Sequence, residues 1–182
     1  MLTVMKCLNS MAILTDQQVR GYDNDWYCVI NGLPIHIASM GGNIPKNFRD
    51  TNVLRDTQRA VGLLLYQDTP IHVNEEFIKS ETAVGYEYID ELDMEQFIFR
   101  LNENAPSFNY NPDWPLKYKL YAYSFIDKAR KGFYSYARSE SDNKYHLVAR
   151  PENPIDFNGE NLNLQPYEVK ENGFPELLVI QD

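Results

Sequence analysis

A thiol, an imidazole and a pair of glycines lie within one short stretch of the chain, CVINGLPIHIASMGGNIP, from Cys28 to Pro45. A cysteine thiolate with a histidine base in hydrogen-bond reach would be a nucleophile, and a Gly-Gly loop after a strand could hold a phosphate group. The loop GGNIP, however, lacks both the Lys-Ser/Thr pair of a P-loop and the third glycine of a dinucleotide-binding loop. The glycines are therefore interpreted as an ordinary loop after a strand.

Whether Cys28 and His36 can meet depends on the turn between them. Asn31-Gly32 is the strongest short signal for a two-residue type I′ turn, because both residue types tolerate positive φ. That turn gives a hairpin over 26–39 in which six side chains share one apolar face: Trp26, Cys28, Ile30, Leu33, Ile35 and Ile37. The other face carries Tyr27, Val29, Pro34 and His36. Since Cys28 and His36 then point to opposite faces, no Cys–His dyad is predicted.

The second strand of this hairpin contains Pro34, which has no N–H group to donate. Proline within a sheet is largely confined to edge strands, so either residues 33–39 form an edge strand or the outer pairing of this strand ends at Pro34. An exposed edge can pair with a second copy of the chain, and a homo-oligomer through strand 33–39 is therefore one alternative.

Three histidines, His36, His72 and His146, alternate with apolar residues in predicted strands. Their spacing matches no known ligand pattern, so no metal site is predicted, and no sequence motif indicates a cofactor. Together with Tyr27, the three histidines are the candidate catalytic residues of a hypothetical dispersed site, in which one imidazole would act as the general base.

Two other groups of residues are candidates for binding. Glu87, Asp90 and Glu91 gather before a predicted helix, where a solvated helix entrance is the simpler interpretation. Tyr110 and Trp114 belong to an aromatic-rich region of a kind that suits interfaces, the alternative being that this region supplies core residues. The net charge of −9, from 26 acidic and 17 basic residues, argues against nucleic acid and anionic membrane surfaces as partners. An acidic chain could bind a basic protein partner, the alternative being that the charge only keeps the chain soluble.

The length of 182 residues and the apolar content of 43% indicate one globular domain over 1–182 with a real core. Residues 1–10 are expected to be peripheral to it, and residues 151–166 to form a long loop. No run approaches the ~20 apolar residues that cross a bilayer. Two cysteines make no disulfide framework, which favours a cytoplasmic protein with reduced thiols.

The order of the predicted elements indicates an α+β fold, with a mostly antiparallel sheet and about three packed helices. Hairpins are predicted at 26–39 and 133–150, and helices at 52–65, 93–103 and 116–131. The last helix has a strand as its rival, because LKYKLYAYSF also alternates with period two. Shorter elements are predicted as follows: strands at 71–73, 83–89, 167–169 and 177–180, and a helical turn at 75–80.

The sequence thus favours a soluble protein-binding module of the inhibitor type that uses an acidic surface and an aromatic-rich region. The alternative is a small-molecule enzyme with a dispersed site of His, Tyr and acidic residues. Whether the protein is an enzyme stays open at this point, because no signature of a common enzyme class is present.

Overall fold

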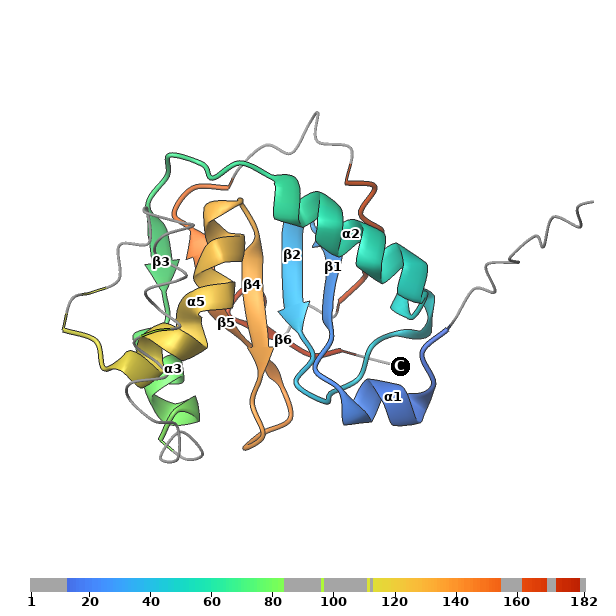
Figure 1. Ribbon diagram of the computed structural model, residues 1–182, viewed down its shortest axis with the longest axis horizontal. Helices are drawn as coiled ribbons and strands as arrows, with labels where there is room; N and C mark the ends of the chain where they lie inside the picture. Colours follow the sequence, from blue (N-terminus) through green and yellow to red (C-terminus); the bar gives the residue numbers. More distant parts are fainter. Residues whose placement is uncertain are drawn as a thin grey trace, which may run out of the picture.

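The computed structural model describes residues 13–83, 96, 111, 113–154, 162–169 and 173–180. Within these residues six strands form one mixed sheet, in the order β1-β2-β4-β5-β3 with β6 beside β5 (Figure 1). The strands are β1 (Asp25–Ile30), β2 (Leu33–Ala38), β3 (Ile71–Val73), β4 (Tyr134–Arg138), β5 (Tyr145–Pro151) and β6 (Leu177–Leu178). The helices are α1 (Asp16–Gly21), η1 (Lys46–Phe48), α2 (Thr51–Leu63), α3 (Glu75–Glu81) and α5 (Leu116–Arg130). The α+β prediction is confirmed.

The first hairpin has the predicted turn and register. Asn31 and Gly32 have φ angles of 51° and 79°, as a type I′ turn requires. Cys28 pairs with Ile35 and lies in the apolar cluster on one face of the sheet, whereas His36 pairs with Tyr27 and points to the other face. The predicted absence of a Cys28–His36 dyad is confirmed.

Of the two alternatives for residues 33–39, the edge strand is wrong, and the end of the outer pairing at Pro34 is confirmed. Strand β2 lies inside the sheet, antiparallel to β1 on one side and parallel to β4 on the other. The parallel ladder begins at Ile35, so Pro34 precedes it by one residue and its missing N–H interrupts no pairing. Since both edges of β2 are occupied, the homo-oligomer through strand 33–39 is not available. The other strand pairs are antiparallel, as predicted.

Helix α2 begins where the sequence predicts it, because the Asp50 side chain accepts hydrogen bonds from the N–H groups of Asn52 and Val53. Apolar residues that recur at helical spacing along this segment predict a buried stripe, which the structure confirms only in part. Val61 is buried, but Val53 and Leu65 are exposed. The helix packs mainly on the edge strand β1, and its buried Val61 also belongs to a small cluster with Phe133 and Leu162.

The segment 116–130 is a helix and not the rival strand. Pro115 precedes its first turn and Gly132, with φ of 98°, follows its end, which is the usual placement of these residues at helix termini. Its buried side carries Tyr121, Ala122, Phe125, Ile126 and Ala129. These side chains pack on β4 and β5, together with Phe77 and Ile78 of α3.

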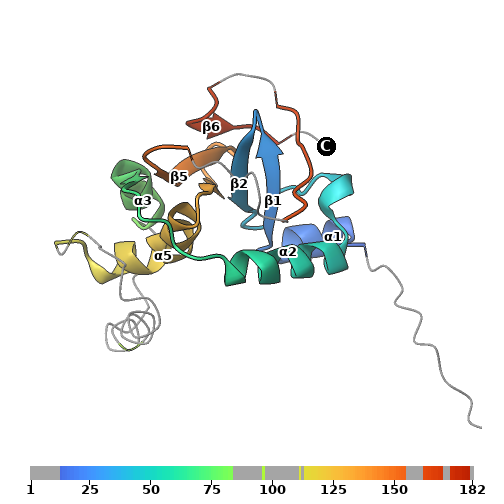
Figure 2. The same cartoon turned by 90° about the horizontal axis from the view of Figure 1, so that it is seen from above.

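The sheet therefore has two covered faces (Figure 2). Helices α2, α3 and α5 lie over one face, and C-terminal residues around β6 lie over the other. The second face buries the six-residue apolar side of the first hairpin against Val19 of α1, Phe48 and Leu178.

Several smaller predictions have mixed outcomes. The 133–150 hairpin, the strand at 71–73 and the helical turn at 75–80 are confirmed as β4–β5, β3 and α3. Only 177–178 of the predicted strand 177–180 pairs, and 167–169 is no strand, although Pro166 bridges Val29. The predicted loop 151–166 begins inside β5 and contributes the buried Leu162 to the core. Helix α1 was not predicted, and the predicted elements at 83–89 and 93–103 lie outside the described residues.

Candidate functional site

Three polar side chains form a row across the helix-covered face of the sheet. Asp25 of β1, His36 of β2 and Ser135 of β4 lie on neighbouring strands. The parallel register of β2 and β4 puts Ser135 opposite His36. We call these three residues the buried polar row.

The two ring nitrogens of His36 face the other two members of the row. Nδ1 lies 2.5 Å from the Ser135 hydroxyl oxygen, and Nε2 lies 3.4 Å from a carboxylate oxygen of Asp25. His36 and Ser135 are fully buried, while the Asp25 side chain is 33% exposed. The rings of Tyr27 and Phe125 cover the imidazole at centroid distances of 5.2 and 6.0 Å. The row thus runs from the protein surface to the interior.

The charges around Asp25 favour its ionised form. Burial raises the pKa of this carboxyl, but His36 and Lys128 outweigh that effect and leave the pKa below its usual value. Burial also raises the pKa of the neighbouring Tyr27 hydroxyl, with the Asp25 and Asp127 carboxylates adding to the rise. Tyr27 is therefore neutral and cannot serve as a base at physiological pH.

Asp, His and Ser are the residue types of a hydrolytic triad. A nucleophilic serine, however, has to reach its substrate, and the Ser135 side chain has no solvent exposure beneath α5. In this position the row links three adjacent strands, through the hydrogen bond between His36 and Ser135 and the 3.4 Å contact between His36 and Asp25. Its members were not found together by sequence reasoning, which singled out only His36.

A second polar cluster lies on α5, close to the row. The Asp127 carboxylate accepts a hydrogen bond from the Tyr66 hydroxyl at 2.9 Å and pairs with Lys128 at 2.9 Å and Lys131 at 3.3 Å. Burial raises the pKa of Asp127, but the two lysines and the tyrosine hydroxyl together lower it by more. The net shift of this pKa is therefore downward. These contacts fasten the segment after α2 to α5.

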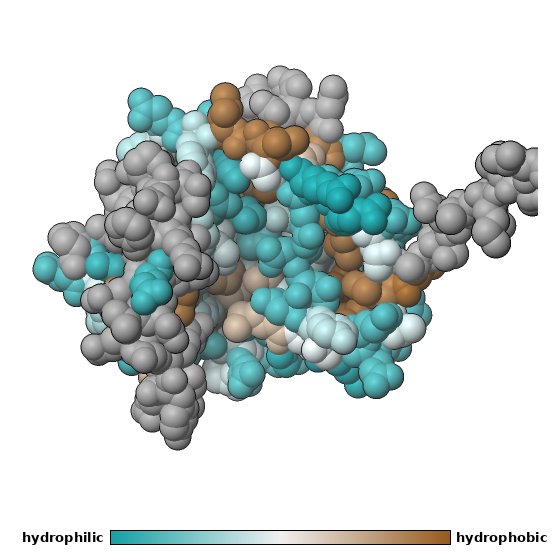
Figure 3. Space-filling model, in the orientation of Figure 1, coloured by the Kyte–Doolittle hydropathy of each residue, from teal (hydrophilic) through white to brown (hydrophobic). Residues whose placement is uncertain are grey.

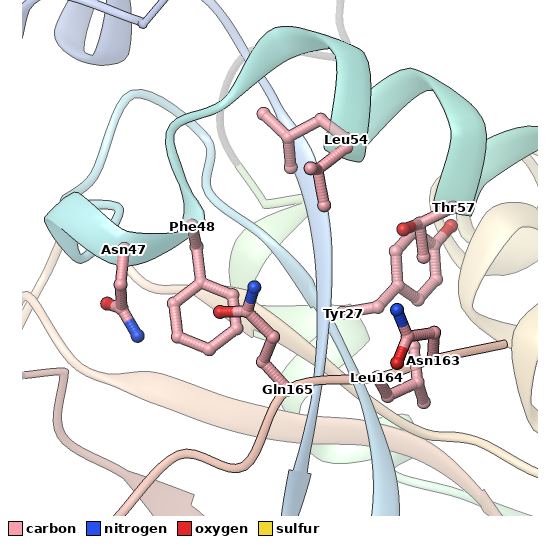
Figure 4. A pocket seen from close by; sticks show the side chains of 9 residues that line it. Tyr27, Asn47, Phe48, Leu54, Thr57, Asn163, Leu164 and Gln165 are labelled. Carbon is pink, nitrogen blue, oxygen red and sulfur yellow. The ribbon is translucent and has the colours of Figure 1, made fainter.

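A small pocket beside Tyr27 lies between β1, α2 and the segment 162–165. Its volume of about 20 Å³ is enough for a water molecule and too small for a substrate. Figure 4 shows Tyr27, Thr57 and Asn163 on one side of it and Phe48 and Gln165 on the other. The pocket has no charged lining residue, so it offers no acid, base or electrophile.

The remaining candidate residues do not join the row. His72 is exposed on β3. His146 stacks on Phe77 at a centroid distance of 4.8 Å and lies 3.0 Å from the Asp142 carboxylate. Of the proposed catalytic set, the structure brings only Tyr27 and His36 together, and both are buried.

The candidate binding residues are placed only in part. Trp114 is buried in the cluster beneath α5, with its ring 6.5 Å from that of Tyr118. This position fits the interpretation of the aromatic region as part of the core. Glu87, Asp90, Glu91 and Tyr110 lie outside the described residues.

The described ranges contain neither a metal-binding cluster nor a helix that could span a membrane. No three His, Cys, Asp or Glu side chains among these residues gather in a way that would hold a metal ion. Over the same ranges, every helix is too short or too polar to span a bilayer.

Asp25, Ser135 and Asp127 are the site residues that sequence reasoning missed. The one local signal for Ser135 is a polar residue between two tyrosines in the strand YSYAR. Comparison of the chain with protein-family models, with curated proteins and with solved structures found no match to any of them.

Proposed function

We propose that this protein is a protein-binding module of the inhibitor type, which contacts its partner through an apolar strip at the C-terminal end of α2. The strip consists of Leu63 and Leu65, whose side chains are 84% and 82% exposed. The observation that carries the proposal is this exposure of two large apolar side chains so close together. Figure 3 shows apolar surface over this end of the helix.

The strip is exposed for a structural reason. Leu64, between the two leucines, packs inward against the cluster of Val61 and Tyr27, so its neighbours on either side point outward. Tyr66 and Gln67, just beyond, are bonded to Asp127 and Arg130 of α5. The segment is therefore held in place with its leucines presented to solvent. Exposed apolar groups on an anchored segment are typical of interaction sites.

The enzyme alternative has less support. Its candidate histidines lie apart in the described chain, and the only pair that meets, Tyr27 and His36, is buried. An active site needs converging polar groups that a substrate can reach. The polar groups of the buried polar row do converge, but a substrate cannot reach the buried His36 and Ser135.

The partner that we propose is a basic protein, because the chain has a net charge of −9. The acidic residues Glu87, Asp90 and Glu91 belong to this proposal as candidate contacts. We propose a cytoplasmic location on the ground that the two cysteines make no disulfide framework.

The test is affinity capture from a lysate of the native host, followed by mass spectrometry, with three immobilised baits. The wild-type chain and Val179→Glu, which changes an exposed apolar residue after β6, should recover the same basic protein. The double variant Leu63→Glu/Leu65→Glu should lose it, since two carboxylates would replace the apolar contact. Equal recovery by all three baits would refute the role of the strip, and recovery of no specific protein by the wild type would refute the binding function.

A further inference from the structure

A groove lies at the other end of α2, between the residues that lead into α1 and helix η1. Its volume is about 530 Å³, and it is wide open to solvent. The described residues that line it are Ile13, Leu14, Thr15, Asp16, Lys46 and Arg49. Figure 1 and Figure 2 both show α1 beside the N-terminal end of α2, opposite the end that carries the apolar strip.

The walls of the groove are fixed by backbone contacts. Ile13 forms a bridge with Asp50, and the Leu14 N–H donates to the Arg49 carbonyl at 2.9 Å. Thr15 then caps α1 through a reciprocal pair of hydrogen bonds with Gln18. Ile13 remains exposed and Leu14 half-buried, so this wall offers an apolar surface.

The opposite wall is cationic. Arg49 is only 6% exposed, and its Nε donates to the Ile44 carbonyl at 2.6 Å while Nη1 contacts the Asp16 carboxylate. Lys46, in η1, is exposed, and its side-chain ammonium has no hydrogen bond or ion pair to any residue that the structure describes.

Three cations surround one carboxylate at this place. The pKa of Asp16 is lowered mainly by the hydrogen bond and charge of Arg49, with Arg20 and Lys46 adding to the effect. Of these cations only Lys46 and Arg49 line the groove with Asp16, so its lining carries one more positive than negative charge, on a chain of net charge −9.

Arg49 also has N–H groups that make no hydrogen bond to a described residue. A guanidinium has five N–H groups in a planar fork that matches a carboxylate. The contacts of Arg49 within the described residues use Nε and Nη1 and leave Nη2 available. The groove thus pairs a carboxylate-binding wall with an apolar wall.

We propose that this groove binds an acidic peptide segment of a partner protein. A carboxylate of the peptide pairs with Lys46 and Arg49, and an adjacent apolar side chain packs on Ile13 and Leu14. A peptide is the occupant because small molecules bind tightly where a pocket buries most of their surface, which an open groove does not do. The site shares no residue with the strip of Leu63 and Leu65, so each can fail without the other.

The experiment measures fluorescence anisotropy of a labelled, end-blocked peptide of alternating Glu and Leu against the full chain. Saturable binding is expected that weakens when the salt concentration rises from about 50 mM to about 500 mM. A peptide of alternating Lys and Leu should bind at least about tenfold more weakly, since like charges repel in the groove. Equal binding of both peptides would overturn the proposal.

Three variants locate the site. Lys46→Glu should weaken binding of the acidic peptide by about tenfold, whereas Asp16→Asn should strengthen it, because it removes the carboxylate that competes for Arg49. Arg59→Glu makes the same charge reversal as Lys46→Glu at an exposed position on α2 and should leave the affinity unchanged. An unchanged affinity for Lys46→Glu, a loss with Asp16→Asn, or a loss with Arg59→Glu as large as with Lys46→Glu would each overturn the assignment.

Discussion

His36 occupies a position where a polar ring is enclosed by aromatic side chains and held from both sides. Its nitrogens face Ser135 and Asp25, and its ring lies between Tyr27 and Phe125. Such a residue stabilises the fold through packing as well as through its hydrogen bond, because both are lost when the side chain is removed.

His36→Ala is therefore expected to lower the free energy of unfolding by about 2–4 kcal/mol, from the cavity and from the unpaired Ser135 hydroxyl. His72→Ala is the matched control, because His72 is exposed on β3. It should change stability by less than about 0.5 kcal/mol. Urea unfolding at pH 7 measures both, and equal effects would contradict the enclosed position of His36.

The lowered pKa of Asp25 predicts how the stability of the fold depends on pH. Because this pKa is lower in the folded chain than in the unfolded chain, ionised Asp25 stabilises the fold at any pH above about 4. That contribution disappears as the pH falls through the lower folded value. Asp25→Asn should thus be less stable than the wild type at pH 7, and the difference should shrink toward about pH 3.

Unfolding midpoints in urea at a series of pH values between 7 and 3 would measure the Asp25 effect. Asp56→Asn serves as the control, since Asp56 is an exposed acid on α2. A stability difference between Asp25→Asn and the wild type that stays constant over this pH range would show that the charge of Asp25 is not what the fold uses.

At the residue scale, part of the site could be predicted from sequence. Asn31-Gly32 is a local signal, and it correctly separates Cys28 from His36. The burial of His36 was not predictable from the hairpin, because it depends on α5 covering that face. Ser135 was missed because its position beside His36 comes from pairing between strands far apart in sequence.

Gly42, in the loop after β2, and Gly62, in α2, differ in the space that a Cβ atom would find. A Cβ on Gly42 would lie 2.4 Å from side-chain atoms of both Arg138 and Tyr145, and 2.8 Å from the Ser39 carbonyl oxygen. That carbonyl cannot move away easily, because it accepts a hydrogen bond from the Gly42 N–H at 2.7 Å. A Cβ on Gly62, within α2, would meet nothing within 4 Å.

Gly42→Ala should accordingly destabilise the protein by about 1–3 kcal/mol through overpacking. Gly62→Ala should stabilise it by about 0.5–1 kcal/mol, because alanine loses less backbone freedom in a helix. Thermal unfolding of the two variants beside the wild type is the measurement. A stabilising Gly42→Ala would contradict the close approach between the loop at 39–42 and β4–β5.

At the element scale, local signals succeeded and distant pairing did not. Asp50 before α2 and Gly132 after α5 mark helix ends that a short window of sequence reveals. Strand β2 lies inside the sheet because it pairs in parallel with β4. No local sequence pattern predicts that pairing. The exposure of apolar residues on α2 was not predicted for a related reason. An apolar stripe shows that a helix packs on something, but it does not show how much of the stripe the neighbouring elements cover.

The described residues form one sheet with a different cover on each face, and one tryptophan is buried on each side of that sheet. Trp26 is buried beside Phe48 and Tyr167 on the C-terminal side, at centroid distances of 4.8 and 5.8 Å. Trp114 is buried beneath α5 on the helical side. Because the chain has only two tryptophans, each face has its own fluorescence probe.

Both faces share β1, β2, β4 and β5, so neither cover can keep its packing once the sheet between them is lost. Trp114→Phe leaves Trp26 as the only tryptophan, and Trp26→Phe leaves Trp114. Within each variant, the urea midpoint from fluorescence should coincide with the midpoint from far-UV circular dichroism, even though each substitution shifts overall stability. A fluorescence transition that precedes the loss of secondary structure in one variant only would mean that the corresponding cover detaches on its own.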